Sequence, residues 1–404
     1  MAKGFILTEH KHIVGSETAR MLELGHPWVL ADRFTKKWPK GHAGDLISLV
    51  SEKGDFLGSA LLDPGDRIVA RVLGRKPVRL NKAWIQGKIE AALRLREILD
   101  LDETTAYRLV NGEGDGLPGL TIDRYENHLM VQLFSECWRP YLQMLVAVLQ
   151  QLLEPHGIYE KRRPQQTRKL QAVDGSNQYS HLLYGEPWPG RQQVRENGLS
   201  FLVELEEGLN TGLFFDQREN RRDLMQQMPG KTFLNLFAYT GAFSVAAACA
   251  GAKKVTSVDN SASYLEWARE NFAVNRVNPK RHEFIVEDCF SALDRFSREK
   301  RKFDVILFDP PSFSTTRKST FSTRGGTAEL VAKTIPLLSQ EGILLCSSNH
   351  QKTDLAEYLK ELRRGAVIAG AELKVIGVKS QPGDFPYPVS FPEGRYLKYV
   401  CCRS

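Results

Sequence analysis

The feature that most constrains the fold is an alternation of apolar strands and helices that begins near residue 231. Apolar segments such as TFLNLFAY, KKVTSVD and FDVILFD are each followed by a stretch with apolar residues at helical spacing, for example SASYLEWARENFAVN. Apolar strands separated by helices form a parallel sheet that is covered by helices on both faces. The second half of the chain, residues 191–404, is therefore predicted to be a doubly wound, mostly parallel α/β domain of the Rossmann-like type.

The first 75 residues have a different pattern. Short apolar stretches at 46–50, 56–62 and 68–72 are broken by Gly, Asp and Pro. Such spacing is typical of a small β-rich barrel or sandwich. Residues 1–75 are therefore predicted to form a separate β-rich module.

Residues 76–190 predict a compact α+β domain. An amphipathic helix is expected over 85–99, followed by three strands, a helix from about Arg139 to Leu153 and a short strand after it. The segment Gln171–Arg195 is rich in Gly, Pro, Asn and Gln, so it is the expected linker to the α/β domain.

Composition limits the location and partners of the chain. No run of about 18 apolar residues and no signal peptide is found, so a cytoplasmic protein without membrane partners is expected. Six scattered cysteines lack zinc-ligand spacing, which favours reduced thiols and no metal. The net charge is +7, with basic clusters near residues 33–40, 67–82 and 160–169. These clusters suit a polyanionic partner, although solvated loops are the simpler interpretation.

Polar residues follow the first four strands of the α/β domain. The first strand ends in Phe237-Ala-Tyr-Thr-Gly241, where Gly241 is expected to let the backbone approach a ligand. The second ends at Asp259, suited to ribose hydroxyls, and the third at Asp288, suited to adenine. Ligands bind at this end of such sheets. The pyrophosphate-binding G-x-G-x-x-G turn is absent, so the pattern favours S-adenosylmethionine over a nicotinamide cofactor. Helix capping is the alternative for both acids.

The fourth strand ends in Asp309-Pro-Pro-Ser-Phe313. The two prolines stiffen the loop and leave carbonyl groups available as acceptors. Phe313 offers a flat surface on which a base taken out of its helix could stack. Packing of Phe313 into the core is the alternative.

At this point the sequence resembles a family of large-subunit ribosomal RNA methyltransferases that combine a PUA-like module, a middle α+β domain and a class I methyltransferase domain. The resemblance rests on His26-Pro-Trp28, on Arg108 to Asp123, on Asn210 to Arg218, and on the motifs ending at Gly241 and Phe313. It implies an RNA-binding front module and 23S ribosomal RNA as partner. It also implies that S-adenosylmethionine is bound by Thr211, Phe214, Asp216, Arg218, Phe237, Tyr239, Thr240, Gly241, Asp259, Ser261, Asp288 and Asp309. A buried Asp216–Arg ion pair is the alternative for the segment 216–218.

The family divides into two chemistries. The 5-methylcytosine branch uses a cysteine after the fifth strand as a nucleophile. Counting from Gly342, that position holds Asn349, whereas Cys346 lies inside the strand and Cys289 lies near the expected adenine. Guanine nitrogen 7 already carries a lone pair and needs only orientation. We therefore expect 7-methylguanosine as the product, with Asp309, Pro310, Phe313 and Asn349 as catalytic residues.

Several alternatives stay open. The chain could make 5-methylcytosine with another cysteine, or it could be an inactive RNA-binding relative. A nicotinamide oxidoreductase would share the sheet, and a methyltransferase for proteins or small molecules would not need the basic front module. A homodimer is compatible with the sequence.

Overall fold

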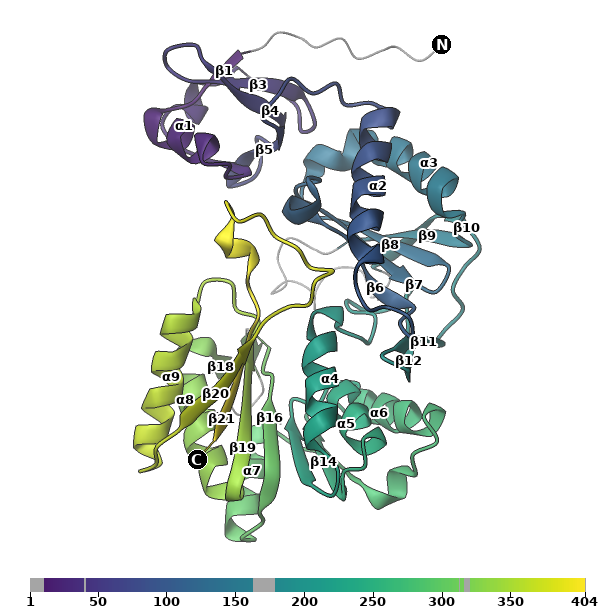
Figure 1. The fold of residues 1–404 in the computed structure, drawn as a ribbon, viewed down its shortest axis with the longest axis vertical. Helices are drawn as coiled ribbons and strands as arrows, with labels where there is room; N and C mark the ends of the chain where they lie inside the picture. Colours follow the sequence, from purple (N-terminus) through teal and green to yellow (C-terminus); the bar gives the residue numbers. More distant parts are fainter. Residues whose placement is uncertain (1–10, 40, 163–178, 312, 316–319, 404) are drawn as a thin grey trace. The chain divides into compact units, whose positions relative to one another are not determined.

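A computed structural model describes residues 11–39, 41–162, 179–311, 313–315 and 320–403, without the side chains of 313–315 and 320–325. The chain forms two compact units (Figure 1). The first unit combines the chain up to Arg191 with Glu204–Asn210 and Gly383–Gly394. The second unit contains Gln192–Val203, Thr211–Pro382 and the chain from Arg395 onward.

The first unit begins with a five-stranded sheet of order β1-β3-β4-β5-β2. Its core contains buried Val29, Leu49, Ala60 and Ala70. The structure thus confirms the predicted β-rich front module. The elements are β1 (Lys11–Ile13), α1 (Ser16–Glu23), β2 (Trp28–Leu30), η1 (Thr35–Lys37), β3 (Leu46–Val50), β4 (Phe56–Leu62) and β5 (Ile68–Gly74).

A second five-stranded sheet of order β10-β9-β8-β7-β6 follows, and α2 and α3 bury their apolar sides in its core. The helix expected from Arg139 begins later, because Glu136–Tyr141 form a 3₁₀ turn that contains Pro140 and is capped by Ser135. The elements are α2 (Lys82–Glu97), β6 (Ala106–Asn111), η2 (Gly112–Asp115), β7 (Leu120–Tyr125), β8 (His128–Leu133), η3 (Glu136–Tyr141), α3 (Leu142–Leu153), β9 (Gly157–Lys161) and β10 (Ser180–Gly185).

The linker expected at Gln171–Arg195 is wrong for two stretches. β10 pairs antiparallel with β9, and β11 (Gln192–Glu196) pairs with β12 (Leu199–Val203). Both segments are strands in which several side chains face solvent, and neither shows the regular alternation of apolar and polar residues that marks a strand in the sequence. Residues 171–178 lie outside the described part of the chain.

A loop from late in the sequence is built into the first unit. The carboxylate of buried Asp384 accepts a hydrogen bond from the Arg108 amide at 3.0 Å, and its carbonyl accepts one from Arg96 at 2.7 Å. The Phe391 ring lies edge-on to Trp28, with centroids 4.5 Å apart. The Arg108–Asp123 motif and the His-Pro-Trp motif of the sequence therefore share a structural role, because both contact residues 383–394.

The second unit contains a seven-stranded sheet of order β15-β14-β13-β16-β19-β21-β20. The first five strands in this order are parallel, and β21 is antiparallel to both of its neighbours. Helices α7–α9 cover one face and α4–α6 the other (Figure 1). The predicted Rossmann-like fold is thus confirmed.

The elements of the second unit complete the description. They are η5 (Phe215–Gln217), α4 (Arg218–Gln227), β13 (Thr232–Leu236), α5 (Ala242–Cys249), β14 (Lys254–Asp259), α6 (Ala262–Val274), η6 (Pro279–Arg281), β15 (Glu283–Val286), α7 (Cys289–Arg298), β16 (Phe303–Phe308), β17 (Phe313–Thr315), β18 (Thr320–Ser322), α8 (Thr323–Thr334), η7 (Ile335–Leu337), β19 (Leu338–Ser348), α9 (Leu355–Ile368), β20 (Lys374–Lys379), η8 (Pro392–Gly394, part of the first unit) and β21 (Lys398–Arg403). Among the described residues, no helix has the length and apolarity needed to cross a bilayer.

A buried ion pair fastens the β11–β12 hairpin to α4. The Arg221 guanidinium makes two hydrogen bonds of 2.6 Å to the Glu196 carboxylate and one of 2.8 Å to the Phe214 carbonyl. Both side chains are almost fully buried. Arg222, the next residue, is partly exposed and pairs with Glu219 at 3.4 Å.

We expect Arg221→Met to destabilise the second unit, because it leaves the Glu196 carboxylate buried without its counter-charge. The cost should be about 3–5 kcal/mol, which corresponds to a melting temperature lower by roughly 6–20 °C in calorimetry. Arg222→Met is the matched control and should change stability by less than about 1 kcal/mol. Equal effects of the two substitutions would contradict this account.

Candidate functional site

The candidate site lies at the edge where the parallel strands of the second unit end. The chain runs from β13 outward to β14 and β15, then returns to place β16 on the other side of β13. Strand order therefore reverses between β13 and β16, and such a reversal is where open α/β sheets bind ligands. The motifs after β13, β14, β15 and β16 all lie along this edge.

The turn after β13 has an unusual backbone. Phe237, Tyr239 and Gly241 have φ angles of 59°, 51° and 76°. Left-handed non-glycine residues concentrate at functional sites, where neighbouring contacts hold them. The Ala238 amide donates to the Val258 carbonyl at 3.0 Å, and the Tyr239 amide donates to the Asp259 carboxylate at 2.9 Å. The turn is thus fastened to the end of β14.

Gly241 has a packing role in addition to the one expected from the sequence. A Cβ at this position would lie 2.7 Å from the Cβ of Ala268 on α6. The positive φ angle and the close packing of α5 on α6 are therefore sufficient reasons for a glycine here, and the approach of a ligand to its backbone stays a prediction. Thr240 is buried, and its hydroxyl donates to the Gly212 carbonyl at 2.6 Å.

Asp259 does not cap a helix. Its two carboxylate oxygens accept from the amides of Tyr239 and Ser261, each at 2.9 Å. Ser261 itself caps α6 and accepts from the Tyr264 amide. Burial raises the pKa of Asp259 despite these bonds. The capping alternative for Asp259 is therefore wrong, and its carboxylate stands at the end of β14.

Asp288 does cap a helix. One carboxylate oxygen accepts from the amides of Phe290 and Ser291, both at 3.1 Å, at the start of α7. The capping role is thus present, and a contact of the same carboxylate with the cofactor remains a proposal.

Aromatic rings line the edge beside Asp259. The Tyr239 ring lies 4.6 Å from that of Tyr264 and 5.4 Å from that of Phe214, measured between centroids. Phe214 and Tyr264 remain 44% and 38% exposed. Exposed aromatic rings next to a carboxylate offer a surface for a nucleoside. Thr211, in the same segment as Phe214, is buried.

Asp309, at the end of β16, belongs to a polar cluster. The Gln217 amide donates to the Asp309 carboxylate at 3.0 Å and to the Ser347 hydroxyl at 2.8 Å. The Gln217 oxygen accepts from Asn220 at 2.6 Å. Gln217 and Ser347 were not singled out by the sequence as site residues, although Gln217 lies inside the quoted segment 210–218. Burial raises the pKa of Asp309 to about 6.

The residues on either side of Gln217 are also engaged in polar contacts. The Asp216 carboxylate accepts from the Tyr396 hydroxyl at 2.7 Å. Arg218 is buried, and its guanidinium donates to Glu219 at 3.1 Å. A buried ion pair close to this segment joins Arg221 to Glu196.

The remaining expected catalytic residues surround the ends of β16 and β19. Pro310 is buried, and Asn349 is exposed immediately after β19. Phe313 begins β17, but its side chain lies outside the described part of the structure. The buried Lys398 ammonium donates to the His350 carbonyl at 2.6 Å and to the Tyr396 carbonyl at 2.7 Å. Lys398 therefore holds the loop that carries Asn349, and its burial lowers its pKa to about 8.

The two cysteines near the site lie under it. Cys346 pairs in register with Phe308 and belongs to the apolar core with Leu330 and Tyr358. Its neighbour Ser347 faces Gln217, so Cys346 points to the opposite face of the sheet. Cys289 is buried beneath the turn after β13, and the Phe237 amide lies 3.3 Å from its sulfur. Burial raises the pKa of both thiols well above the usual value.

Comparison with known proteins decides the family. The chain matches the family model of S-adenosylmethionine-dependent methyltransferases over residues 107–388 and that of a PUA-like domain over residues 13–75. Ribosomal RNA large subunit methyltransferase I of Alteromonas mediterranea is 31% identical over 385 residues, covering 95% of this chain and 96% of that protein. This chain belongs to the S-adenosylmethionine-dependent methyltransferases.

Other relatives agree. Ribosomal RNA large subunit methyltransferase I of Escherichia coli is 32% identical over 380 residues, which cover 94% of this methyltransferase and 95% of that protein. The crystal structure of SMU.776 complexed with SAH has a TM-score of 0.88 at 30% identity, covering 98% and 100% of the two chains. The cofactor of the methyltransferase is S-adenosylmethionine. The strand-end edge offers acceptor carboxylates and exposed aromatic rings, which are the groups that a nucleoside-containing cofactor needs.

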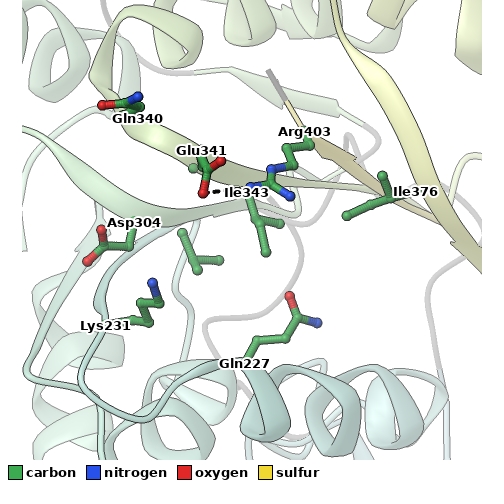
Figure 2. Close-up of a pocket in the computed structure, with 10 residues that line it drawn as sticks. Gln227, Lys231, Asp304, Gln340, Glu341, Ile343, Ile376 and Arg403 are labelled. Atoms are coloured by element: carbon green, nitrogen blue, oxygen red, sulfur yellow. Dashed lines mark ion pairs between the residues drawn. The ribbon is translucent and has the colours of Figure 1, made fainter.

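A polar cavity of about 250 Å³ at the opposite edge of the sheet has a different character (Figure 2). It lies where β13, β16 and β19 pair at their amino-terminal sides. Its charged groups include both signs, because Lys231 and Arg403 face it together with Asp304 and Glu341. Arg403 and Glu341 form an ion pair of 2.9 Å. Figure 2 thus shows a cavity whose lining includes two cations and two carboxylates.

Asp309→Asn should stabilise the methyltransferase at neutral pH. The folded state holds the Asp309 proton more tightly than the unfolded state, so the fold loses stability as the pH rises from about 4 to about 6. At pH 7.5 the variant should be more stable by roughly 1–3 kcal/mol. The difference between the variant and the parent melting temperatures should vanish below pH 4. A variant that melts at or below the parent temperature at pH 7.5 would show that the carboxylate is well accommodated.

Proposed function

We propose that this methyltransferase methylates guanine nitrogen 7 in large-subunit ribosomal RNA. The observation that carries the proposal is the side chain at the end of β19, where Asn349 is exposed and no thiol lies beside it. Ribosomal RNA as the substrate is supported by the names of the relatives and by the basic clusters of the front module. The product is supported by the chemistry of the site.

We propose that the residues predicted from the sequence to bind S-adenosylmethionine form one continuous binding surface. The Asp259 carboxylate would accept the ribose hydroxyls, because the amides of Tyr239, Asn260 and Ser261 do not use all of its lone pairs. Phe214 and Tyr239 would contact the nucleoside, and Asp288 would meet the adenine amino group. The backbone of the turn from Phe237 to Gly241 would hold the methionine part, with Thr211, Asp216, Arg218, Thr240 and Ser261 shaping the surroundings.

The absence of a usable thiol separates the two chemistries. Carbon 5 of cytosine becomes a nucleophile only after a thiolate has added to carbon 6. All six cysteines are described, and none lies at the ends of β16 or β19. Cys346 faces the apolar core, and its raised pKa keeps it protonated at neutral pH. A thiolate attacks and a thiol does not, so this arrangement disfavours 5-methylcytosine.

Guanine nitrogen 7 suits the residues that are present. Its lone pair forms the new bond to the methyl carbon while the carbon–sulfur bond breaks, and the positive charge moves from sulfur to the purine. No proton has to leave. The Asp309 carboxylate would stabilise the developing cation, and the Asn349 amide would donate to the purine acceptors. Because Asp309 has a pKa of about 6, the rate is expected to fall below that pH.

Two substitutions separate cofactor binding from helix capping. Asp259→Ala should weaken S-adenosylmethionine binding by roughly 10- to 100-fold, because two hydrogen bonds to a charged group are lost. Asp288→Asn keeps a capping oxygen and loses one acceptor for the adenine amino group, so the affinity should fall by only about 2- to 10-fold. Isothermal titration calorimetry gives both affinities. Unchanged binding to the Asp259 variant would place the ribose elsewhere.

The product and the role of the thiols are tested together. Ribosomal RNA from a strain lacking the methyltransferase is incubated with the protein and labelled cofactor, and the modified nucleoside is identified by mass spectrometry. We expect 7-methylguanosine, full activity of Cys346→Ala and Cys289→Ala, and at least tenfold slower transfer by Asn349→Ala. A 5-methylcytosine product, together with inactivity of the Cys346 variant, would overturn the proposal.

A further inference from the structure

The second unit carries a basic cavity away from the cofactor edge. It has a volume of about 450 Å³ and lies at the amino-terminal sides of β14 and β15, near the ends of α5 and α6, which are labelled in Figure 1. The residues that line it are Ala248, Ala252, Lys253, Arg276, Val277, Asn278, Arg281 and His282. Three of them carry a positive charge at neutral pH, and none is a carboxylate.

The cations of this cavity lack acidic partners. Within the described residues, Lys253, Arg276 and Arg281 form no ion pair, and all three are exposed. The nearby carboxylate of Glu283 is instead paired with Lys254 and Arg301. Like charges held close together repel one another, so the cavity has a positive potential that an anion would relieve.

His282, which also lines this cavity, is affected by the same positive charges. Its Nδ1 atom accepts from the Val255 amide at 3.1 Å, and its ring lies edge-on to Phe272 at 5.2 Å. The neutral ring therefore carries its proton on Nε2, which makes that atom a donor. Burial, Lys254 and Arg281 lower the pKa of His282. The contrast with the cavity of Figure 2 is clear, because that one contains both signs of charge.

We propose that this basic cavity binds the phosphate backbone of the RNA substrate, at nucleotides other than the methylated one. The inference rests on the proposed function, which makes RNA the substrate. Strand β14 separates the cavity from the cofactor edge, and six residues of strand span roughly 20 Å. An RNA that reached both places would therefore be held across this end of the catalytic sheet. Contacts made only by side chains with phosphate add affinity without base specificity.

The test compares two triple variants of the full chain that lose the same charge. The first, Lys253→Gln/Arg276→Gln/Arg281→Gln, alters the cavity. The second, Lys360→Gln/Arg363→Gln/Arg364→Gln, alters an exposed side of α9. Affinity for ribosomal RNA is measured from 50 to 300 mM salt, with melting temperature and S-adenosylmethionine affinity as checks on folding.

The cavity variant should bind RNA about tenfold more weakly at 150 mM salt. Its plot of log affinity against log salt should be shallower by roughly 2, since each phosphate contact contributes about 0.7–0.9 to the slope. The rate of methyl transfer at saturating RNA should stay within twofold, while KM for RNA rises. The α9 variant should behave like the parent protein.

Different failures have different signatures. If the parent protein methylates ribosomal RNA but the cavity variant binds like the α9 variant, the cavity inference is wrong and the proposed function stands. If RNA binding depends on the cavity but no methyl group is transferred, the proposed function fails alone. If the cavity variant binds RNA like the parent protein but no longer binds an acidic protein that the parent protein binds, the cavity serves a protein partner and the inference is wrong. A parent protein that binds no RNA would overturn both.

Discussion

The reversal of strand order between β13 and β16 is the constraint on which the site depends. The chain leaves β13 toward β14 and later returns to place β16 on the other side of β13. The loops that follow β13 and β16 therefore run in opposite directions, and ligands bind between such loops. The turn after β13 and Asp309 after β16 flank the site. Gln217 lies outside the sheet, and its amide donates hydrogen bonds both to Asp309 and to Ser347 on the next strand. The geometry of the site is thus set by connectivity first and by side chains second.

Much of this was predictable because local patterns suffice for it. Apolar strands that alternate with helices fix a parallel sheet, so Asp259, Asp288 and Asp309 could be placed at strand ends from the sequence alone. The predictions of a helix at 139–153 and of a linker at 171–195 were less accurate. Pro140 and a capping serine replace the first helical turn by a 3₁₀ turn, and a polar edge strand such as β10 has no apolar alternation to recognise.

What local patterns could not supply is contact between distant segments. The partner of Asp309 is 92 residues away in Gln217, and the residue that crowds Gly241 lies on the following helix. The loop 383–394 joins two strands of the second unit, yet it packs against Arg96, Arg108 and Trp28 in the first. Similarly, Lys253 and Arg276 are ordinary surface residues in sequence and become a basic cavity only when α5 and α6 end side by side.

The chemistry of β19 depends on the alternation of side chains along a strand. Ser347 faces the polar cluster at Asp309, so its neighbour Cys346 must face the core, and a one-residue shift would exchange them. Pairing of β19 with β16 on one side and β21 on the other fixes which side chains face the site. The pairing with β21 runs over six consecutive residue pairs. The orientation of the Cys346 thiol toward the core is therefore set by the register of the whole sheet and not by a single contact. A catalytic cysteine could return only beyond the strand end, at position 349, where the chain has asparagine. This geometry is the reason for proposing direct methyl transfer to a base atom that already carries a lone pair.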